Sequence, residues 1–343
     1  MLKDAIALLT LGRSLSIEQA EQAMAEIMNG TATPSQIAAF VVALRMKGET
    51  ADEIIGMAKT MKAKSLHVNT SDTDELIVDS VGTGGDSSGT FNISTAAAFV
   101  AAATGLKVAK HGNRAASSQC GSADVLEALG IRIDLDAGQV RRCLQEVGIA
   151  FMFAQAFHPA LKHAAATRRE IGIRTVFNIL GPLTNPAGAR AQVTGVADGS
   201  LLEKIALVLQ HLGCHHALVV HGEDGLDEIT ISGKTFVCEL KDDYIHSYTI
   251  DPEDFGLKRA SLETIKGGDV KRNAEMLRSV LAGDSGPKRD VVLMNAAAVL
   301  MAGDKIKTFQ QGAAMAKEAI NSGRALAKLE QLIEFTQKLD KKK

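Results

Sequence analysis

The sequence has no tryptophan, only two tyrosines and six prolines, and few cysteines among its 343 residues. The four cysteines, Cys120, Cys143, Cys214 and Cys238, lie far apart and form no CxxC pair. This spacing fits free thiols better than disulfides or a structural zinc site. The cysteine pattern therefore favours a reducing compartment, and we expect a cytoplasmic protein.

Strong charge of one sign and long apolar runs are also missing. The 38 basic and 40 acidic residues leave a formal net charge of −2, which argues against binding nucleic acid chiefly through its phosphates. The most apolar stretch, residues 95–109, is shorter than the roughly 20 residues that a membrane helix needs. The first residues lack the zones of a signal peptide, and Lys341–Lys343 are typical of a solvated tail. We expect no nucleic-acid partner and no membrane partner.

The first 65 residues carry repeated signals for the start of a helix. Three S/T-x-x-E/Q capping boxes occur, at Ser16 with Gln19, Thr33 with Gln36, and Thr50 with Glu53. Each box satisfies two backbone groups at a helix end through reciprocal side-chain bonds. Pro34 suits the first position of a helix, and Gly30 suits the end of the helix that begins near Ile17. These signals predict a small unit of three short helices over residues 1–66.

The pattern changes near residue 76, where short β-branched runs begin to alternate with helical periods. Predicted strands cover residues 76–81, 106–110, 131–135, 149–153, 192–197, 216–221 and 234–240. Predicted helices cover residues 94–104, 121–129, 137–147, 158–169, 200–212, 269–282 and 308–322. This alternation predicts a large α/β domain, residues 74–343, around a mostly parallel central sheet. Ligands of such folds bind at the carboxyl ends of the strands.

The first chemical motif, residues 79–86, directly follows a predicted strand. It holds three glycines in four residues, which lets backbone N–H groups surround an anion. It is neither the dinucleotide fingerprint, which needs glycine at Ser87, nor a Walker A motif, because Thr90 rather than lysine follows Gly89. Residues 92–95 then open an alanine-rich helix whose N-terminus favours phosphate. A tight turn before an ordinary helix start is the alternative.

The second motif, residues 110–118, gathers cations, an amide and hydroxyls after the next predicted strand. This composition suits a polyanion such as a diphosphate, and a polar surface loop is the alternative.

Asp227 and Glu228 follow a later strand between glycines and could hold Mg²⁺ together with water or substrate phosphates. Adjacent acids are common on surfaces, so this pair gains weight only beside the two phosphate loops. Arg168 could pair with a carboxylate, although a structural ion pair is the commoner role of an arginine.

Seven motifs in order make the chain resemble a known family. They are GTGGD, NIST, KHGNR, GSADVLEALG, HPA, GIRTVFNILGPLTNP and LDEI, and they lie within residues 5–335. Together they resemble the anthranilate phosphoribosyltransferases, enzymes of tryptophan biosynthesis with a nucleoside phosphorylase-like fold. The resemblance implies a helical domain that forms a homodimer and is joined by a segment near residues 165–190. It also implies an active site in the cleft between this domain and the α/β domain.

The resemblance also implies the site residues. 5-Phosphoribosyl 1-diphosphate would contact Gly82, Gly85, Asp86, Thr90, Asn92, Ile93, Ser94, Thr95, Lys110, His111, Gly112, Asn113, Arg114, Ala115, Ala116, Ser117, Ser118 and Ser122. Anthranilate would contact Gly82, Asn113, Arg168, His158 and Pro159. Magnesium, two ions per subunit, would be held by Ser94, Asp227 and Glu228, and the catalytic residues would be Lys110, His111, Asp227 and Glu228. We expect Gly82 and Gly85 to permit close approach of the ligand, with positive φ.

The implied reaction is displacement of diphosphate by the anthranilate amine. Negative charge builds on the leaving group while positive charge develops on the ribose ring, so catalysis should be mainly electrostatic and positional. A nucleoside phosphorylase of the same fold is one alternative, and a substrate screen separates it. A nucleic-acid-binding relative without catalysis is another. The Asp227–Glu228 pair and the net charge of −2 argue against this second alternative.

Overall fold

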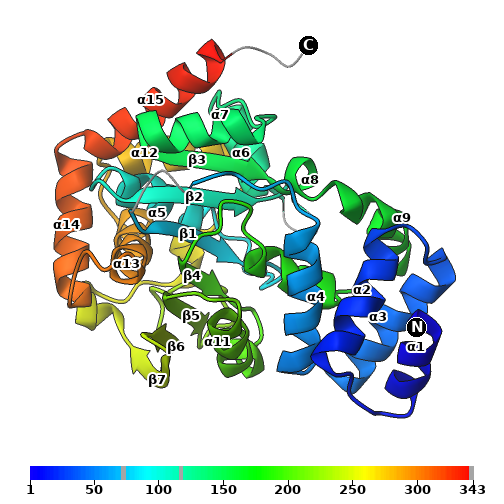
Figure 1. The fold of residues 1–343 in the computed structure, drawn as a ribbon. Coiled ribbons are helices and arrows are strands. Elements are labelled where there is room, and N and C mark those ends of the chain that lie inside the picture. Colours follow the sequence, from blue (N-terminus) through cyan, green and yellow to red (C-terminus); the bar gives the residue numbers. More distant parts are fainter. Residues whose placement is uncertain (71–74, 116–118, 340–343) are drawn as a thin grey trace.

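The computed structural model describes residues 1–70, 75–115 and 119–339. Its N-terminal unit consists of α1 (Leu2–Thr10), α2 (Ile17–Met28), α3 (Pro34–Lys47) and α4 (Ala51–Ala63), which lie together at one end of the molecule (Figure 1). All three predicted capping boxes form, with both reciprocal bonds, at the starts of α2, α3 and α4. The prediction of three helices missed α1, whose N-cap residue makes no side-chain capping bond.

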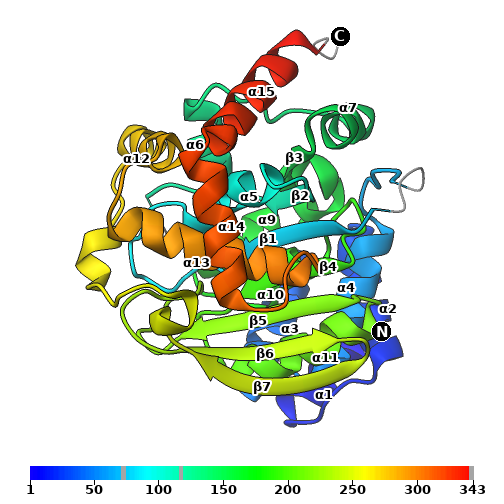
Figure 2. The ribbon, with the colours of Figure 1, turned by 90° about the vertical axis from the view of Figure 1, so that its left-hand side faces the viewer.

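A seven-stranded sheet forms the centre of the rest of the chain. Its strands are β1 (Ile77–Gly82), β2 (Lys107–Gly112), β3 (Ile149–Phe153), β4 (Ala191–Gly195), β5 (His216–Gly222), β6 (Thr235–Lys241) and β7 (Tyr244–Ile250). The strand order is β3-β2-β1-β4-β5-β6-β7, parallel from β3 to β5 and antiparallel from β5 to β7. Figure 2 shows β5, β6 and β7 side by side at one edge. This mostly parallel sheet beside a helical unit confirms the predicted fold class.

Two strand predictions differ from the structure. Residues 131–135 form no strand, because Ile131, Ile133 and Leu135 alternate into the core as a connection between two helices. β7 was missed because this edge strand is mostly exposed and its apolar and polar residues do not alternate. The first error arises because alternation reports burial on one face, whereas a strand also needs a hydrogen-bonding neighbour.

Helices cover both faces of the sheet. They are α5 (Ile93–Ala102), α6 (Ser122–Ala128), α7 (Ala137–Arg142), α8 (Ala154–Phe157), α9 (Lys162–Ile171), α10 (Val176–Leu180), α11 (Leu202–His211), α12 (Val270–Ala282), α13 (Pro287–Ala302), α14 (Phe309–Asn321) and α15 (Arg324–Lys338). The helix predicted over residues 137–147 continues past α7 as a π-helix, Cys143–Val147. The prediction missed α8, α10, α13 and α15. In α13, residues 291–302 are all buried and show no polar face. No helix among the described residues combines the length and apolarity needed to cross a bilayer.

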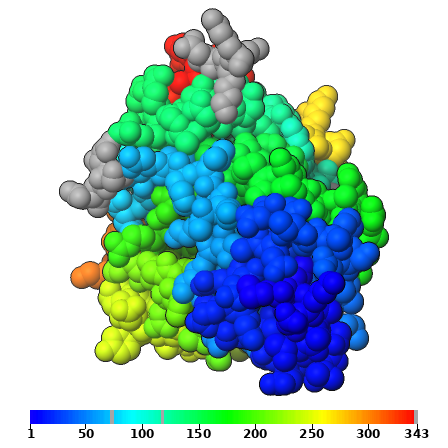
Figure 3. Space-filling model, turned by 45° about the vertical axis from the view of Figure 1, so that its right-hand side comes forward, coloured from blue at the N-terminus to red at the C-terminus, as the bar shows by residue number. Residues whose placement is uncertain are grey.

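Two hydrophobic clusters hold the elements in place. The first cluster includes residues of β1, β2, β3, α5, α6 and α13. The second cluster joins α1–α4 to α9, α10, α11 and one face of β5 and β6. The helical unit is therefore packed against residues 164–183, far away in sequence, and Figure 3 shows the N-terminal residues as one region with residues of the α9 segment against it.

Candidate active site

The predicted motifs meet at the carboxyl ends of the central strands. The strand order reverses direction between β1 and β4, which is where open α/β sheets bind ligands. A cavity of about 350 Å³ lies there. We call its two sides the donor wall and the acceptor wall. The donor wall consists of the loops after β1, β2 and β5 with the start of α5, and the acceptor wall consists of Arg168, Arg174, Phe177, Asn178, Gly181 and Pro182.

The glycine loop after β1 is shaped by Asp227 and by backbone conformation. A Cβ atom at Gly82 would lie 2.5 Å from Oδ2 of Asp227, and the N–H of Gly84 donates to the same oxygen at 2.6 Å. Positive φ occurs at Gly84 and Gly85. The expectation of positive φ at Gly82 was wrong, because this residue still belongs to β1. Gly82 is needed for the close approach of a carboxylate, and Gly85 for its left-handed turn.

Asp227 and Glu228 lie half-buried in the cavity wall. Burial, followed by the charge of Asp86, raises the pKa of Asp227 to about 7. Burial and the charge of Asp227 raise the pKa of Glu228 to about 8, although its Oε1 accepts the N–H of Ser94 at 3.1 Å. Crowded carboxylates of this kind favour a cation that neutralises them. The described residues contain no group of three or more histidine, cysteine or acidic side chains suited to a metal, so an ion here needs further oxygen ligands from substrate or water.

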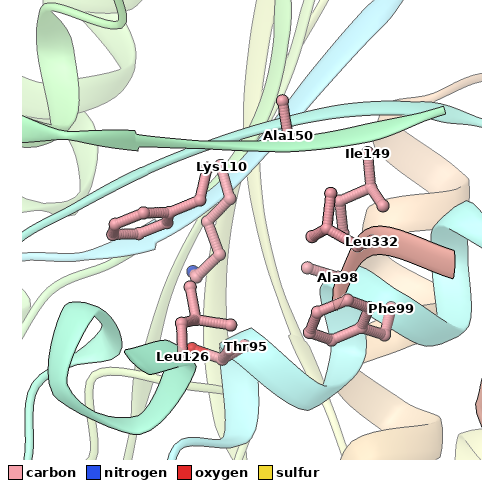
Figure 4. Close-up of a pocket in the computed structure, with 9 residues that line it drawn as sticks. Thr95, Ala98, Phe99, Lys110, Leu126, Ile149, Ala150 and Leu332 are labelled. Atoms are coloured by element: carbon pink, nitrogen blue, oxygen red, sulfur yellow. The ribbon is translucent and has the colours of Figure 1, made fainter. Parts of the chain in front are cut away.

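Lys110 reaches the cavity from inside the fold. Its stem passes Leu126 and Thr95 and borders a small void lined by Phe99 and Ile149 (Figure 4). Its ammonium donates to the carbonyl of Ser80 and, at 3.3 Å, to Oγ of Ser94. Burial lowers the pKa of Lys110, whereas the carboxylates of Asp79 and Glu228 oppose that change. A cation held in this way points a desolvated charge at the start of α5.

The loop after β2 is held by its own polar contacts. Oγ of Ser122 donates to the carbonyl of Asn113 at 3.3 Å. The guanidinium of Arg114 pairs with Asp124 at 3.0 Å and with Glu127, and these partners raise its pKa. The charge of Arg114 is thus shared with two acids before any ligand binds. The predicted residues Ala116, Ser117 and Ser118 lie outside the described residues.

The acceptor wall presents an arginine and is backed by two neutral histidines. The Arg168 guanidinium lies 5.0 Å from the ring centre of Phe177, and it makes no ion pair among the described residues. Burial alone lowers its pKa. The rings of His111 and His158 lie 5.1 Å apart, and burial lowers their pKa values to about 3 and about 4. An unpaired guanidinium on an aromatic face suits a flat anion.

The cavity brings together most of the predicted site residues. Its lining includes Gly82, Gly85, Asp86, Thr90, Asn92, Ile93, Ser94, Thr95, Lys110, His111, Gly112, Asn113, Arg114, Ala115, Ser122, Arg168, Asp227 and Glu228. It does not include His158, which lies behind His111, or the exposed Pro159. The Asn92 side chain is engaged with the carbonyl of Cys120 and with Asn273, so its backbone is the part left for a ligand.

Arg174 is a lining residue that the predicted site set omits. It donates to the carbonyl of Thr83 at 3.0 Å and lies against Gly85, so it links the acceptor wall to the glycine loop. The motif GIRTVFN contained it, but nothing in the spacing distinguished it from a structural arginine. Cys120 also lines the cavity, and burial raises the pKa of its thiol to about 11, which keeps it protonated and unreactive.

Comparison with known proteins agrees with this geometry. Residues 74–326 match the family described as "Glycosyl transferase family, a/b domain", and residues 3–65 match "Glycosyl transferase family, helical bundle domain". An anthranilate phosphoribosyltransferase of Dehalococcoides mccartyi is 57% identical over 341 residues, 99% of each chain. The chain belongs to the anthranilate phosphoribosyltransferase family.

Solved structures of the anthranilate phosphoribosyltransferase family share the whole fold. The enzyme from Thermus thermophilus superposes with a TM-score of 0.92 at 44% identity, covering 97% of this chain and 99% of that one. The Saccharomyces cerevisiae enzyme, solved in complex with phosphoribosyl diphosphate and magnesium, has a TM-score of 0.89 at 30% identity, with 98% of each chain covered. The helical unit and the α/β unit are thus arranged as in these anthranilate phosphoribosyltransferases.

The raised carboxylate pKa values predict how the stability of the metal-free protein depends on pH. Between the ordinary pKa of a carboxyl group and the raised values of Asp227 and Glu228, the folded state binds more protons than the unfolded state. The two groups therefore stabilise the fold less as pH rises from about 4 to about 8. The double variant Asp227→Asn/Glu228→Gln should lack this loss. Its melting temperature minus that of the wild type should increase with pH, and a difference that stays constant would contradict the burial of these charges.

Proposed function

We propose that this chain transfers the 5-phosphoribosyl group from 5-phosphoribosyl 1-diphosphate to the amine of anthranilate. The products are N-(5-phosphoribosyl)anthranilate and diphosphate, and the reaction is the second step of tryptophan synthesis from chorismate. One observation carries the proposal. One side of a single cavity carries a glycine loop, a buried lysine and paired carboxylates. The other side carries Arg168, which lies on an aromatic ring and has no ionic partner in the described part of the chain.

The donor wall would bind the diphosphate. N–H groups of residues 82–86 and of the start of α5 would surround its oxygens, and Lys110 would add a positive charge. The residues present fit Mg²⁺, because Asp227 and Glu228 offer hard oxygen ligands whose repulsion a cation would relieve. We propose two ions per subunit, with Ser94 as a further ligand. Bound Mg²⁺ would neutralise charge on the departing diphosphate.

The acceptor wall would orient anthranilate. Arg168 would take the carboxylate while Asn113, from the opposite loop, would contact the same substrate. The amine of an aniline is uncharged at neutral pH, so it can attack without prior loss of a proton. After attack, the nitrogen is strongly acidic and a weak base suffices. We assign this role to His111, whose Nε2 has no hydrogen-bond partner among the described residues and whose pKa of about 3 keeps it neutral.

We further propose a cytoplasmic homodimer formed through the helical domain, residues 1–66. Leu11 and Met46 leave large apolar side chains exposed on this domain, at 74% and 82%. The segment 165–190 would belong to the same body, because α9 and α10 share its hydrophobic cluster, and residues 74–343 would form the α/β domain. All four cysteines are free and buried, which suits a reducing cytoplasm.

The acceptor assignment is tested by Arg168→Ala. Loss of a charge-assisted pair in a partly desolvated site should reduce kcat/KM for anthranilate by about 2–4 kcal/mol in transition-state stabilisation. Affinity for phosphoribosyl diphosphate should change little. Aniline, which lacks the carboxylate, should be a poor substrate of the wild type and should lose little further in the variant. Anthranilate fluorescence, followed with each substrate and magnesium omitted in turn, measures the transfer.

Arg169→Ala is the matched control, because Arg169 is the next residue of α9, is exposed and does not line the cavity. It should behave as the wild type. Equal impairment of both substrates in Arg168→Ala, or aniline use equal to anthranilate use, would show that Arg168 is structural. Phosphorolysis of a nucleoside by the wild type, without transfer to anthranilate, would favour the nucleoside phosphorylase alternative.

A further inference from the structure

The strands β1 and β2 separate as they approach the cavity. They pair at two positions, Ile77 with Lys107 and Val78 with Val108. On their outer sides, β1 pairs with β4 over five residues and β2 pairs with β3 over five. Buried backbone groups that lose a strand partner must find another, because an unpaired N–H or C=O is costly.

Side chains supply these partners. The carboxylate of Asp79, which is fully buried, accepts the N–H of His111 at 3.2 Å and the side-chain amide of Asn185 at 2.7 Å. The same amide nitrogen of Asn185 donates to the carbonyl of Ala109 at 2.8 Å. Lys110 reaches across in the other direction to the carbonyl of Ser80. The gap between the two strands is thus filled by a polar network instead of a regular ladder.

The same network fastens the segment that follows α10, residues 181–187. Asn185 is its contact with β1 and β2, and Nδ1 of His111 lies 3.2 Å from the carbonyl of Gly181. Gln192 of β4, the strand neighbour of Asp79, donates to the carbonyl of Pro182 at 3.2 Å. Three adjacent strands therefore hold one segment, and Gly181 and Pro182 of this segment belong to the acceptor wall.

We propose that Asp79 and Asn185 are positioning residues for the acceptor side of the reaction. Neither lines the cavity, so neither is placed to touch a substrate. They set the distance between two parts of the cavity wall. One part is the ends of β1 and β2, which carry the proposed diphosphate loops. The other is residues 181–187, which complete the acceptor wall. This assignment rests on the proposed function, because it concerns the orientation of anthranilate relative to the ribose.

The hydrogen bond between Asn185 and Asp79 can be tested by exchanging the two side chains. Asp79 accepts two hydrogen bonds, and asparagine there would turn one N–H group toward another donor. Asp79→Asn should therefore release Asn185. In the double variant Asp79→Asn/Asn185→Asp, the new amide can donate to the new carboxylate while its oxygen still accepts from His111. Recovery should be partial, because the carbonyl of Ala109 loses its donor and then faces a carboxylate oxygen.

The test combines kinetics, binding and amide exchange. Asn185→Ala, which keeps the charge of Asp79 near Lys110, should raise the KM for anthranilate about tenfold, whereas calorimetry should give a nearly unchanged Kd for phosphoribosyl diphosphate. Asp79→Asn should raise the same KM. The exchanged double variant should recover part of the lost anthranilate affinity. Hydrogen exchange should speed up at the His111 amide and in residues 181–187. Asn185→Ala supplies the same readouts if Asp79→Asn does not fold.

Glu239→Gln is the control, since Glu239 is another buried strand carboxylate, bonded to His216 and Tyr248 outside the cavity. It should lower stability without changing the KM for anthranilate. A wild-type KM for anthranilate in both Asp79→Asn and Asn185→Ala would overturn the positioning role, as would a double variant no better than Asp79→Asn. A wild-type protein that fails to transfer to anthranilate would instead overturn the proposed function, and the exchange experiment would still report on the network.

Discussion

Asp227→Asn and Glu228→Gln are each expected to reduce turnover by about a hundredfold or more and to raise the magnesium concentration needed for half-maximal rate. The two carboxylates share one wall of the cavity. Burial, followed by repulsion from a neighbouring carboxylate (Asp86 for Asp227, and Asp227 for Glu228), raises both pKa values. Replacing either with an amide relieves that repulsion and removes a charge that would hold the ion. The folded state should persist, so the loss is expected in kcat with a melting temperature at or above that of the wild type at about pH 8.

Glu223→Gln is the matched control, because Glu223 lies in the same loop, is exposed and does not line the cavity. Its carboxylate accepts the N–H of Lys234, a bond that an amide oxygen can also accept. Rate measured against magnesium concentration separates the three variants. Wild-type activity and magnesium dependence in Asp227→Asn or Glu228→Gln would remove the metal assignment.

Gly85→Val is expected to abolish measurable binding of phosphoribosyl diphosphate. Gly85 has φ of +80°, a region that β-branched residues rarely adopt, and a Cβ there would overlap a guanidinium nitrogen of Arg174. Either the loop, which belongs to the donor wall, or Arg174, which donates to the carbonyl of Thr83 in that loop, must move. Isothermal titration calorimetry measures the loss directly.

Gly213→Val separates backbone strain from the loss of the binding surface. Gly213 has φ of +81°, no described residue comes within 4 Å of a Cβ placed there, and it follows α11 outside the cavity. The substitution should destabilise the fold through strain alone and leave the affinity for phosphoribosyl diphosphate intact. Unchanged affinity in Gly85→Val, in contrast, would place the diphosphate in another loop.

The parts of the fold that the sequence predicted well are those with local signals. Capping boxes identified three helix starts in the first 65 residues, and apolar runs located six of the seven strands. The helix α13 was not predicted, because a helix that is buried on every side has no alternation of apolar and polar faces. The edge strand β7 was not predicted, because it is exposed over most of its length and lacks the alternation of apolar and polar residues of a half-buried strand.

The candidate site likewise contains residues that local sequence signals identify and residues that they do not. Glycine spacing and the Asp227–Glu228 pair pointed to residues that line one cavity. Arg174 could not be chosen, because its role depends on a contact with Thr83 that lies 91 positions away. Asp79 and Asn185 are also distant in sequence, and their interaction follows from where two strands separate. Such contacts are products of tertiary packing, which a single sequence does not display.

The two hydrophobic clusters support different parts of the candidate site. Ile93, Leu226 and Ile229, which flank Ser94 and the acidic pair, are rooted in the first cluster. Ala164, Val176 and Phe177, which carry the acceptor wall, are rooted in the second. Substitutions in the second cluster should therefore reshape the acceptor wall for a different aromatic amine, while the residues of the donor wall keep their packing in the first cluster. Directed evolution toward new acceptors should find its productive changes there, with the first cluster left untouched.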